Sequence, residues 1–159
     1  MRIGIYGGTF NPPHLGHLTA AKTAFELLSL DKLLLIPARV PPHKNLPDGS
    51  ATAAQRLQMT RLAGDAIGVA TEVLELEIAR KGKSFTSDTL RELREIYPTD
   101  ELWLLMGTDM FLTFGAWHEP ETILSLAGIA AFGRTEKNTE ELFARQRENL
   151  TKSYPTARI

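Results

Sequence analysis

Short apolar runs alternate with helical patterns along this chain, and that alternation limits the folds that the chain can adopt. Residues 33–36 and 102–106 are apolar at every position. A strand with one face in water alternates apolar and polar residues, so a continuous apolar run indicates a strand buried on both faces. Parallel strands are buried in this way, because the helices that connect them cover both faces of the sheet. We therefore expect an α/β protein with a Rossmann-like, doubly wound parallel sheet of about five strands.

The expected elements follow from these runs and from the residues that interrupt them. Strands are expected over residues 2–6, 32–36, 73–78, 102–106 and 129–132. Helices are expected over residues 18–28, 51–67, 86–97 and 119–127. Asn138 and Glu141 resemble a capping box that opens a last helix through Leu150.

The fold class also predicts where a ligand lies. In an open parallel sheet the ligand binds outside the carboxyl ends of the strands, near the switch in strand order. The candidate binding segments are therefore those that follow Tyr6, Ile36, Met106 and Phe132.

Length and composition exclude several classes of protein. A chain of 159 residues is expected to form one domain, 1–159, and the absence of cysteine excludes a disulfide framework, a thiolate zinc site and a cysteine nucleophile. The 18 Lys and Arg residues against 19 Asp and Glu residues give no support for a nucleic-acid or membrane-surface partner. Because no apolar run has the length of a membrane span and the N-terminus lacks a signal-peptide pattern, we expect a cytoplasmic protein.

The segment after the first expected strand combines several features of an anion-binding site. Gly7 and Gly8 allow backbone N–H groups to approach an anion closely. Pro12 and Pro13 suit a loop that leads into a helix, whose N-terminus offers unpaired N–H groups and the positive end of its dipole. The segment is neither a G-x-G-x-x-G motif nor a Walker A loop. The sequence therefore has the physical features of phosphate binding without either common fingerprint.

Two histidines lie at the start of the helix that follows this turn. His14 and His17 are three residues apart, so they project from one face, and Gly16 between them leaves room for a flat ligand. Such a pair could serve as zinc ligands, an acid/base pair, phosphate donors or polar surface residues. No third zinc ligand or H-E-x-x-H motif accompanies it, so we assign no metal site. Nucleotidyl transfer suits the pair, because N–H donors stabilise the charge that develops on phosphate oxygens.

The stretch from Gly8 to His17 resembles the signature of the HxGH nucleotidylyltransferase superfamily. Four further stretches are similar to those of bacterial nicotinate-nucleotide adenylyltransferases: Pro41–Lys44, Ser84–Leu90, Gly107–Asp109 and Trp117–His118. The resemblance covers most of the chain. It implies transfer of an adenylyl group from ATP to nicotinate mononucleotide, which yields nicotinate adenine dinucleotide and pyrophosphate in NAD biosynthesis.

The resemblance implies a set of residues on the ATP side of the site. These are the catalytic pair His14 and His17 and the phosphate- or ATP-binding residues Gly8, Thr9, Phe10, Gly16, Lys44, Gly107, Asp109 and Arg134. Three of them have simpler alternatives: Lys44 as an exposed loop lysine, Asp109 as a helix cap, and Arg134 as a salt-bridged surface arginine. Because no carboxylate cluster is present, Mg²⁺ is expected to arrive with the ATP phosphates.

On the acceptor side the resemblance implies that Thr86 and Trp117 bind nicotinate mononucleotide. Thr86 would lie at a helix N-terminus, which favours the carboxylate of nicotinate over neutral nicotinamide, although simple capping also explains a threonine there. Trp117 could stack on a flat pyridine ring or pack as a core residue under a loop.

The sequence departs from the family near its C-terminus. A Ser-Ser-Thr-x-x-Arg type motif is usual there, and nothing resembling it is present before Ile159. We expect a C-terminal part that is shortened or diverged, with fewer phosphate donors and with apolar surface that favours a homo-oligomer. The alternatives are a phosphopantetheine adenylyltransferase-like enzyme and a catalytically impaired nucleotide-binding module. A nicotinamide-dependent dehydrogenase is disfavoured, because the first turn lacks the dinucleotide fingerprint.

Overall fold

The computed structural model describes residues 1–42, 46–133 and 139–159. Its sheet contains the strands β1 (Arg2–Gly8), β2 (Lys32–Pro37), β3 (Thr71–Val73), β4 (Glu101–Met106) and β5 (Gly128–Ala131). The helices of the described residues are α1 (Leu15–Leu27), α2 (Ala53–Ala66), α3 (Leu76–Ala79), α4 (Thr86–Ile96), α5 (Thr108–Leu112), the 3-10 helix η1 (Phe114–Ala116), α6 (Pro120–Leu126) and α7 (Thr139–Ser153). Within these residues no helix is both long and apolar enough to cross a membrane.

The five strands form one sheet in the order β3-β2-β1-β4-β5, and every neighbouring pair is parallel. Tyr6 on the central strand β1 pairs with Leu35 of β2 on one side and with Leu105 of β4 on the other. The chain moves outward from β1 to β3 and then returns to the other side of β1, so the strand order switches between β1 and β4. This topology confirms the predicted doubly wound sheet, and it places the carboxyl ends of β1 and β4 side by side.

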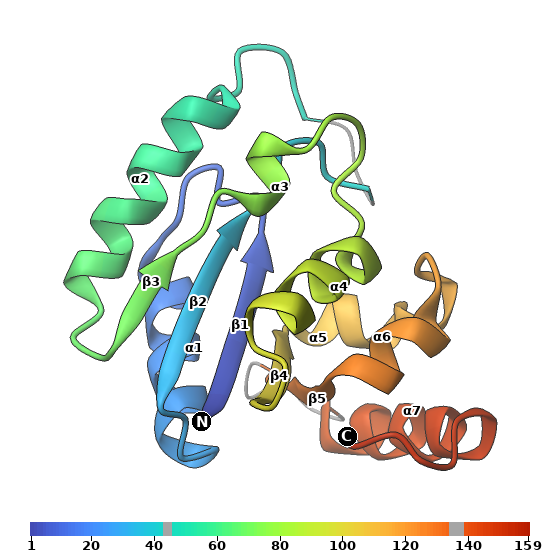
Figure 1. The fold of residues 1–159 in the computed structure, drawn as a ribbon. Helices are drawn as coiled ribbons and strands as arrows, with labels where there is room; N and C mark the ends of the chain where they lie inside the picture. The colour runs from blue at the N-terminus through green and yellow to red at the C-terminus, as the bar shows by residue number, and fades with distance from the viewer. Residues whose placement is uncertain (43–45, 134–138) are drawn as a thin grey trace.

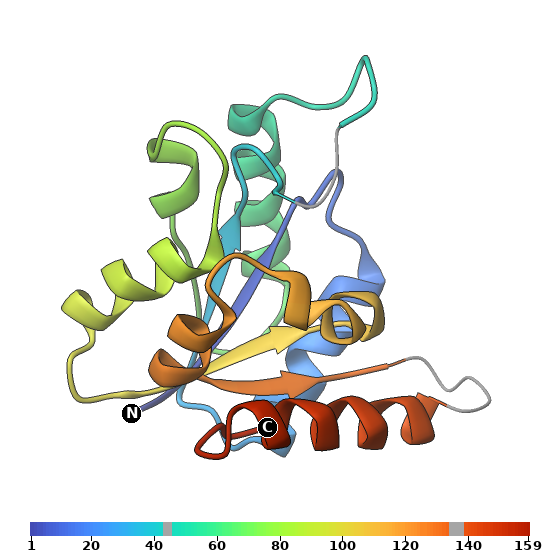
Figure 2. The same cartoon turned by 90° about the vertical axis from the view of Figure 1, so that its right-hand side faces the viewer.

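Helices cover both faces of the sheet (Figures 1 and 2). Successive side chains of a strand point to opposite faces. Ile3 and Ile5 pack in one core cluster with buried residues of α4, α6 and α7, whereas Tyr6 packs in the other with Ala21 and Ala24 of α1. The same alternation divides the apolar runs of β2 and β4, which explains why those strands are apolar at every position.

The expected strand 73–78 is wrong over most of its length. Strand β3 ends at Val73, and residues 76–79 form the short helix α3 instead. Strand β3 pairs with β2 through hydrogen bonds to the backbone N–H of Leu33 and the carbonyl of Leu35. The next position on β2 that would donate a backbone N–H to this edge is Pro37. Proline has no N–H group, and the edge strand therefore loses its partner at this point.

The other expected elements are present with small shifts at their ends. Two short helices that the sequence did not predict, α5 and η1, follow β4. Helix α7 begins at Thr139, and the proposed cap at Asn138 lies outside the described residues.

Candidate active site

The turn after β1 is tied to the carboxyl edge of the sheet. The carbonyl of Gly8 accepts the backbone N–H of Ala38, which follows β2, at 2.8 Å. Phe10 has a left-handed backbone (φ 49°), and its ring is buried beneath Gly8. A β carbon on Gly8 would meet that ring at 3.3 Å, a tight contact that the glycine avoids where the turn passes over the phenylalanine.

His14 and His17 cap helix α1 reciprocally. The Nδ1 atom of His14 accepts the backbone N–H of Gly16 at 3.1 Å, and the Nδ1 atom of His17 accepts the backbone N–H of His14 at 3.0 Å. This is a capping box in which two imidazoles replace the usual hydroxyl and carboxylate. The two rings stack, with centroids 3.7 Å apart and planes 22° apart. The predicted common face is therefore present, and the rings are in contact.

The capping bonds also determine the tautomer of each ring. An imidazole nitrogen that accepts a backbone N–H carries no proton, so a neutral ring with this contact carries its proton on Nε2. Both His14 and His17 are in this arrangement. In the neutral form, each ring thus offers its Nε2–H as a hydrogen-bond donor.

Two aromatic side chains, Tyr6 and Phe10, pack against the ring of His17. The His17 ring lies edge-to-face with Phe10, with centroids 5.3 Å apart, and with Tyr6 at 6.1 Å. Burial raises the pKa of Tyr6 to about 12, so the phenol stays neutral. These contacts fix the orientation of His17 through packing.

The space beside Gly16 is occupied by the ring of His14. A β carbon on Gly16 would lie 2.9 Å from Cε1 of His14. The glycine thus makes room for the flat ring of His14, whereas the sequence pattern predicted room for a ligand.

Arg56 of helix α2 fixes the turn after β1, and the sequence did not predict this role. Its side chain is 1 % exposed and donates to the carbonyls of Thr9 (2.9 Å), Ala38 and Arg39 (3.0 Å). One guanidinium therefore joins the segments that follow β1 and β2. An arginine in a polar stretch of helix predicts an exposed side chain, and nothing in the sequence around Arg56 indicates that its side chain is buried.

Gly107 and Asp109 lie at the carboxyl end of β4, next to β1. Gly107 is the N-cap residue of α5, and no side chain caps this helix. Asp109 lies in the first turn with an exposed side chain. Its alternative explanation as a capping residue is therefore not supported, and its placement at the edge of the sheet agrees with the predicted ligand side.

Thr86 is the first residue of α4, and Phe85 is its N-cap residue. No side chain caps this helix, so the capping explanation for Thr86 is not supported either. Ser84 holds this end of α4 at the carboxyl edge: its hydroxyl accepts the backbone N–H of Arg39, and its own N–H donates to Val40 at 2.9 Å.

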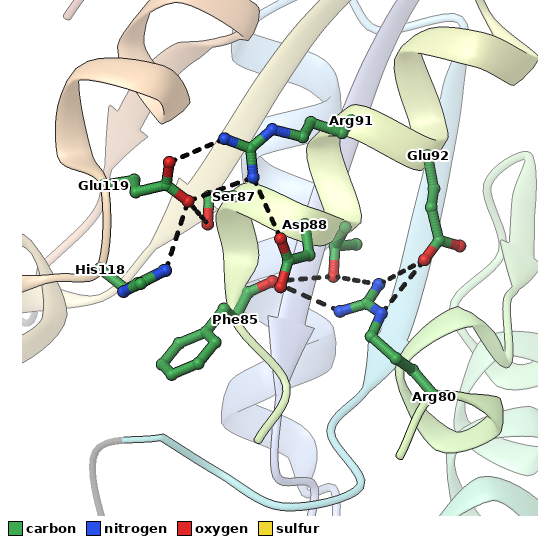
Figure 3. Close-up of polar contacts among 9 residues, drawn as sticks. Arg80, Phe85, Ser87, Asp88, Arg91, Glu92, His118 and Glu119 are labelled. Carbon is green, nitrogen blue, oxygen red and sulfur yellow. Dashed lines mark hydrogen bonds and ion pairs between the residues drawn. The ribbon is translucent and has the colours of Figure 1, made fainter. Parts of the chain in front are cut away.

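Residues at the entry to α6 face the N-terminus of α4. The ring of His118 stacks on that of Phe85, with centroids 4.2 Å and planes 26° apart (Figure 3). Trp117 is half-buried, and its ring lies 5.2 Å from that of Phe114 at the margin of the core. Part of the Trp117 side chain is therefore core packing, as one of the two alternatives predicted. The pairing of Phe85 with His118 was not predicted, because the two residues are far apart in sequence.

Two of the predicted site residues, Lys44 and Arg134, lie outside the described residues. Among the residues that the structure does describe, no group of three His, Cys, Asp or Glu side chains could hold a metal ion. The described side chains thus do not form a metal cage, and we derive no catalytic step from a protein-bound metal.

The fold and the paired imidazoles define a class: doubly wound α/β proteins in which a helix capped by two histidines begins beside the switch point of the sheet. The sequence pattern of the cytidylyltransferase-like family matches residues 5–158. The chain belongs to this family.

The names of curated relatives are more specific than the description of the family. A probable nicotinate-nucleotide adenylyltransferase of Geobacter metallireducens is 46% identical over 134 residues, which cover 84% of this chain and 61% of the relative. One from Dictyoglomus thermophilum is 44% identical over 134 residues, covering 84% of this chain and 67% of the relative. Against the first three relatives the chain spans 61% to 62% of their length.

Solved structures share the fold. The nicotinic acid mononucleotide adenylyltransferase of Plasmodium falciparum complexed with NaAD superposes with a TM-score of 0.76 at 19% identity, covering 91% of this chain and 70% of that chain. A putative nicotinate-nucleotide adenylyltransferase of Vibrio parahaemolyticus has a TM-score of 0.69 at 24% identity, covering 96% and 83%. At these identities the likeness concerns the fold.

Proposed function

We propose that this protein transfers the adenylyl group of ATP to nicotinate mononucleotide, with release of pyrophosphate. The observation that carries the proposal is the stacked imidazole pair that caps α1 at the carboxyl edge of β1. The names of the relatives support the choice of acceptor.

The reaction forms one P–O bond and breaks another. A phosphate oxygen of the mononucleotide attacks the α-phosphorus of ATP, and the bond to the leaving pyrophosphate breaks. Negative charge increases on the oxygens of the reacting phosphate and of the leaving group. Nε2–H donors on His14 and His17, together with backbone N–H groups of Gly8, Thr9 and Phe10, are proposed to bind these oxygens. Such donors stabilise the transition state without a covalent intermediate.

The remaining predicted residues extend this assignment. Gly107 and Asp109 are proposed to face the adenosine end, with Lys44 and Arg134 as cations for the phosphates. Thr86 and Trp117 are proposed to bind the acceptor. Mg²⁺ is proposed to enter on the ATP phosphates, since the described side chains form no metal cage. A cytoplasmic location and a homo-oligomer remain predictions.

Pyrophosphate release tests the proposal. Purified protein is incubated with ATP, Mg²⁺ and either nicotinate mononucleotide or phosphopantetheine, with calorimetric binding measured in parallel. Release only with nicotinate mononucleotide supports the proposal. Release with phosphopantetheine supports the alternative enzyme, and binding without release supports an impaired nucleotide-binding module.

A further inference from the structure

An ion pair joins the entry of α6 to the first turns of α4 (Figure 3). The guanidinium of Arg91 donates to both carboxylate oxygens of Glu119, from Nη2 to Oε1 at 2.8 Å and from Nη1 to Oε2 at 3.1 Å. Arg91 also donates to Asp88 at 3.0 Å on its own helix. A bidentate contact of this kind fixes both the distance and the relative orientation of two groups.

The carboxylate of Glu119 has two further contacts. The hydroxyl of Ser87, which is fully buried on α4, donates to Oε2 at 3.4 Å. Nε2 of His118 lies 3.3 Å from the same oxygen. Glu119 thus touches the helix and the residue that precedes it in the chain. The guanidinium of Arg91 holds the pKa of the Glu119 carboxyl below its usual value, so the pair stays charged near neutral pH.

The backbone of Glu119 is left-handed, with φ 50° and ψ 57°. Residues other than glycine adopt this conformation only where surrounding contacts hold them in it. The turn directs His118 back onto α4, where its ring stacks on Phe85. The contacts of the Glu119 side chain therefore hold a turn that its backbone does not favour.

The opposite side of α4 is fixed independently. Arg80 donates to Glu92 at 2.8 Å, to the hydroxyl of Thr89 at 3.2 Å and to the carbonyl of Phe85 at 3.5 Å. The N-terminus of α4 is thus anchored without Glu119. The Arg91–Glu119 pair attaches the 117–119 turn to that anchored helix, together with the Ser87 hydrogen bond and the Phe85–His118 stack.

We propose that Arg91 and Glu119 are positioning residues for the acceptor mononucleotide: their ion pair holds the turn that carries Trp117 and His118 against the N-terminus of α4. This inference rests on the proposed function. Arg91 is 47% exposed and Glu119 34% exposed, and exposed pairs contribute little to global stability. The pair therefore acts on the geometry of the acceptor side, and its loss changes acceptor binding more than the melting temperature.

The test compares Arg91→Met, Glu119→Gln, the double variant and Arg91→Lys with the wild type. Arg61→Met is the matched control, because Arg61 of α2 is 46% exposed and pairs with Glu75, the N-cap residue of α3. The readouts are the melting temperature, the nuclear Overhauser contact between the Phe85 and His118 rings without ligand, and KM for each substrate. Each single variant is expected to weaken the ring contact and to raise KM for nicotinate mononucleotide about tenfold. KM for ATP and kcat should change less than about twofold, with Arg91→Lys intermediate.

The double variant is expected to match the single variants, because both remove the same contact. An unchanged acceptor KM together with a lost ring contact would overturn the inference, and so would an equal rise in KM for ATP. If the wild type binds nicotinate mononucleotide without releasing pyrophosphate, only the adenylyl transfer is wrong, and calorimetric Kd values replace KM in the comparison. If the wild type does not bind nicotinate mononucleotide, the inference and the proposed function both fail.

Discussion

His14 and His17 lie ring on ring, and each receives a backbone N–H of the same helix start through its Nδ1 atom. These two hydrogen bonds to Nδ1 cap α1, and they also place the proton of each neutral imidazole on Nε2. The capping role and the proposed catalytic role can be tested separately, because other residues can supply the cap without supplying an imidazole N–H.

The first prediction replaces His17 by Gln. Glutamine at this position of a capping box keeps an acceptor for the N–H of His14, so the melting temperature should stay close to that of the wild type. The ring and its Nε2–H are lost, and pyrophosphate release should fall by at least about a hundredfold. His14→Asn, which retains a good N-cap residue, should behave in the same way. A near-normal rate in either variant removes that histidine from its catalytic role.

The second prediction concerns Gly16→Ala. Alanine favours a helix over glycine by about 1 kcal/mol, so stability should not decrease through propensity. The added carbon would lie 2.9 Å from Cε1 of His14 and must displace that ring. We expect kcat to fall at least about tenfold, with little net change in melting temperature, because losing the His14 cap offsets the gain in helix propensity. Gly115→Ala is the control, because a β carbon there meets nothing within 4 Å. Equal activity of the two variants contradicts the prediction.

The third prediction concerns the choice of acceptor. Helix α4 begins at Thr86 with no side-chain cap, and its N-terminus attracts an anion. The carboxylate of nicotinate mononucleotide should therefore give a kcat/KM at least about tenfold above that of the neutral nicotinamide form. The measurement is initial rates with both mononucleotides at fixed ATP. Equal values would reject a role for the helix terminus in specificity.

The fourth prediction concerns Arg56→Met. The substitution removes the donor that three backbone carbonyls share, so the free energy of unfolding should fall by about 3 kcal/mol. Arg61→Met on the same helix removes only an exposed ion pair and should cost less than about 1 kcal/mol. Urea unfolding of both variants decides the matter, and similar losses would show that the buried contacts of Arg56 are not special.

The fifth prediction concerns pH. Burial raises the pKa of Glu77 to about 7, against about 4.3 in an unfolded chain, although Thr89 and Arg80 act in the opposite direction. The folded state thus binds a proton that the unfolded state has lost. The free energy of unfolding should fall between about pH 4.5 and pH 7, by up to about 3 kcal/mol.

Glu77→Gln removes this titration, so the variant should be more stable than the wild type at pH 8 and should lose the slope below pH 7. Glu75→Gln, two residues away and exposed, is the control. The experiment is urea unfolding at a series of pH values. A slope that persists in Glu77→Gln would mean that another group is responsible.

The sequence could predict the fold because its information on this point is local. Continuous apolar runs at 33–36 and 102–106 indicate strands buried on both faces, and such strands belong to parallel sheets. The same reasoning located the carboxyl edge of β1 and the common face of His14 and His17, since helical spacing alone puts residues three apart together. The end of β3 was not predicted, because it depends on which residue of β2 lies opposite.

Contacts between distant segments were decided only by the tertiary structure. Arg56 is buried because carbonyls from two separate loops converge on it, and Glu119 meets Arg91 across 28 residues of sequence. Periodicity and local motifs report which face of an element is apolar. They carry no information on which partner a polar side chain finds, because that partner is brought there by packing elsewhere in the chain.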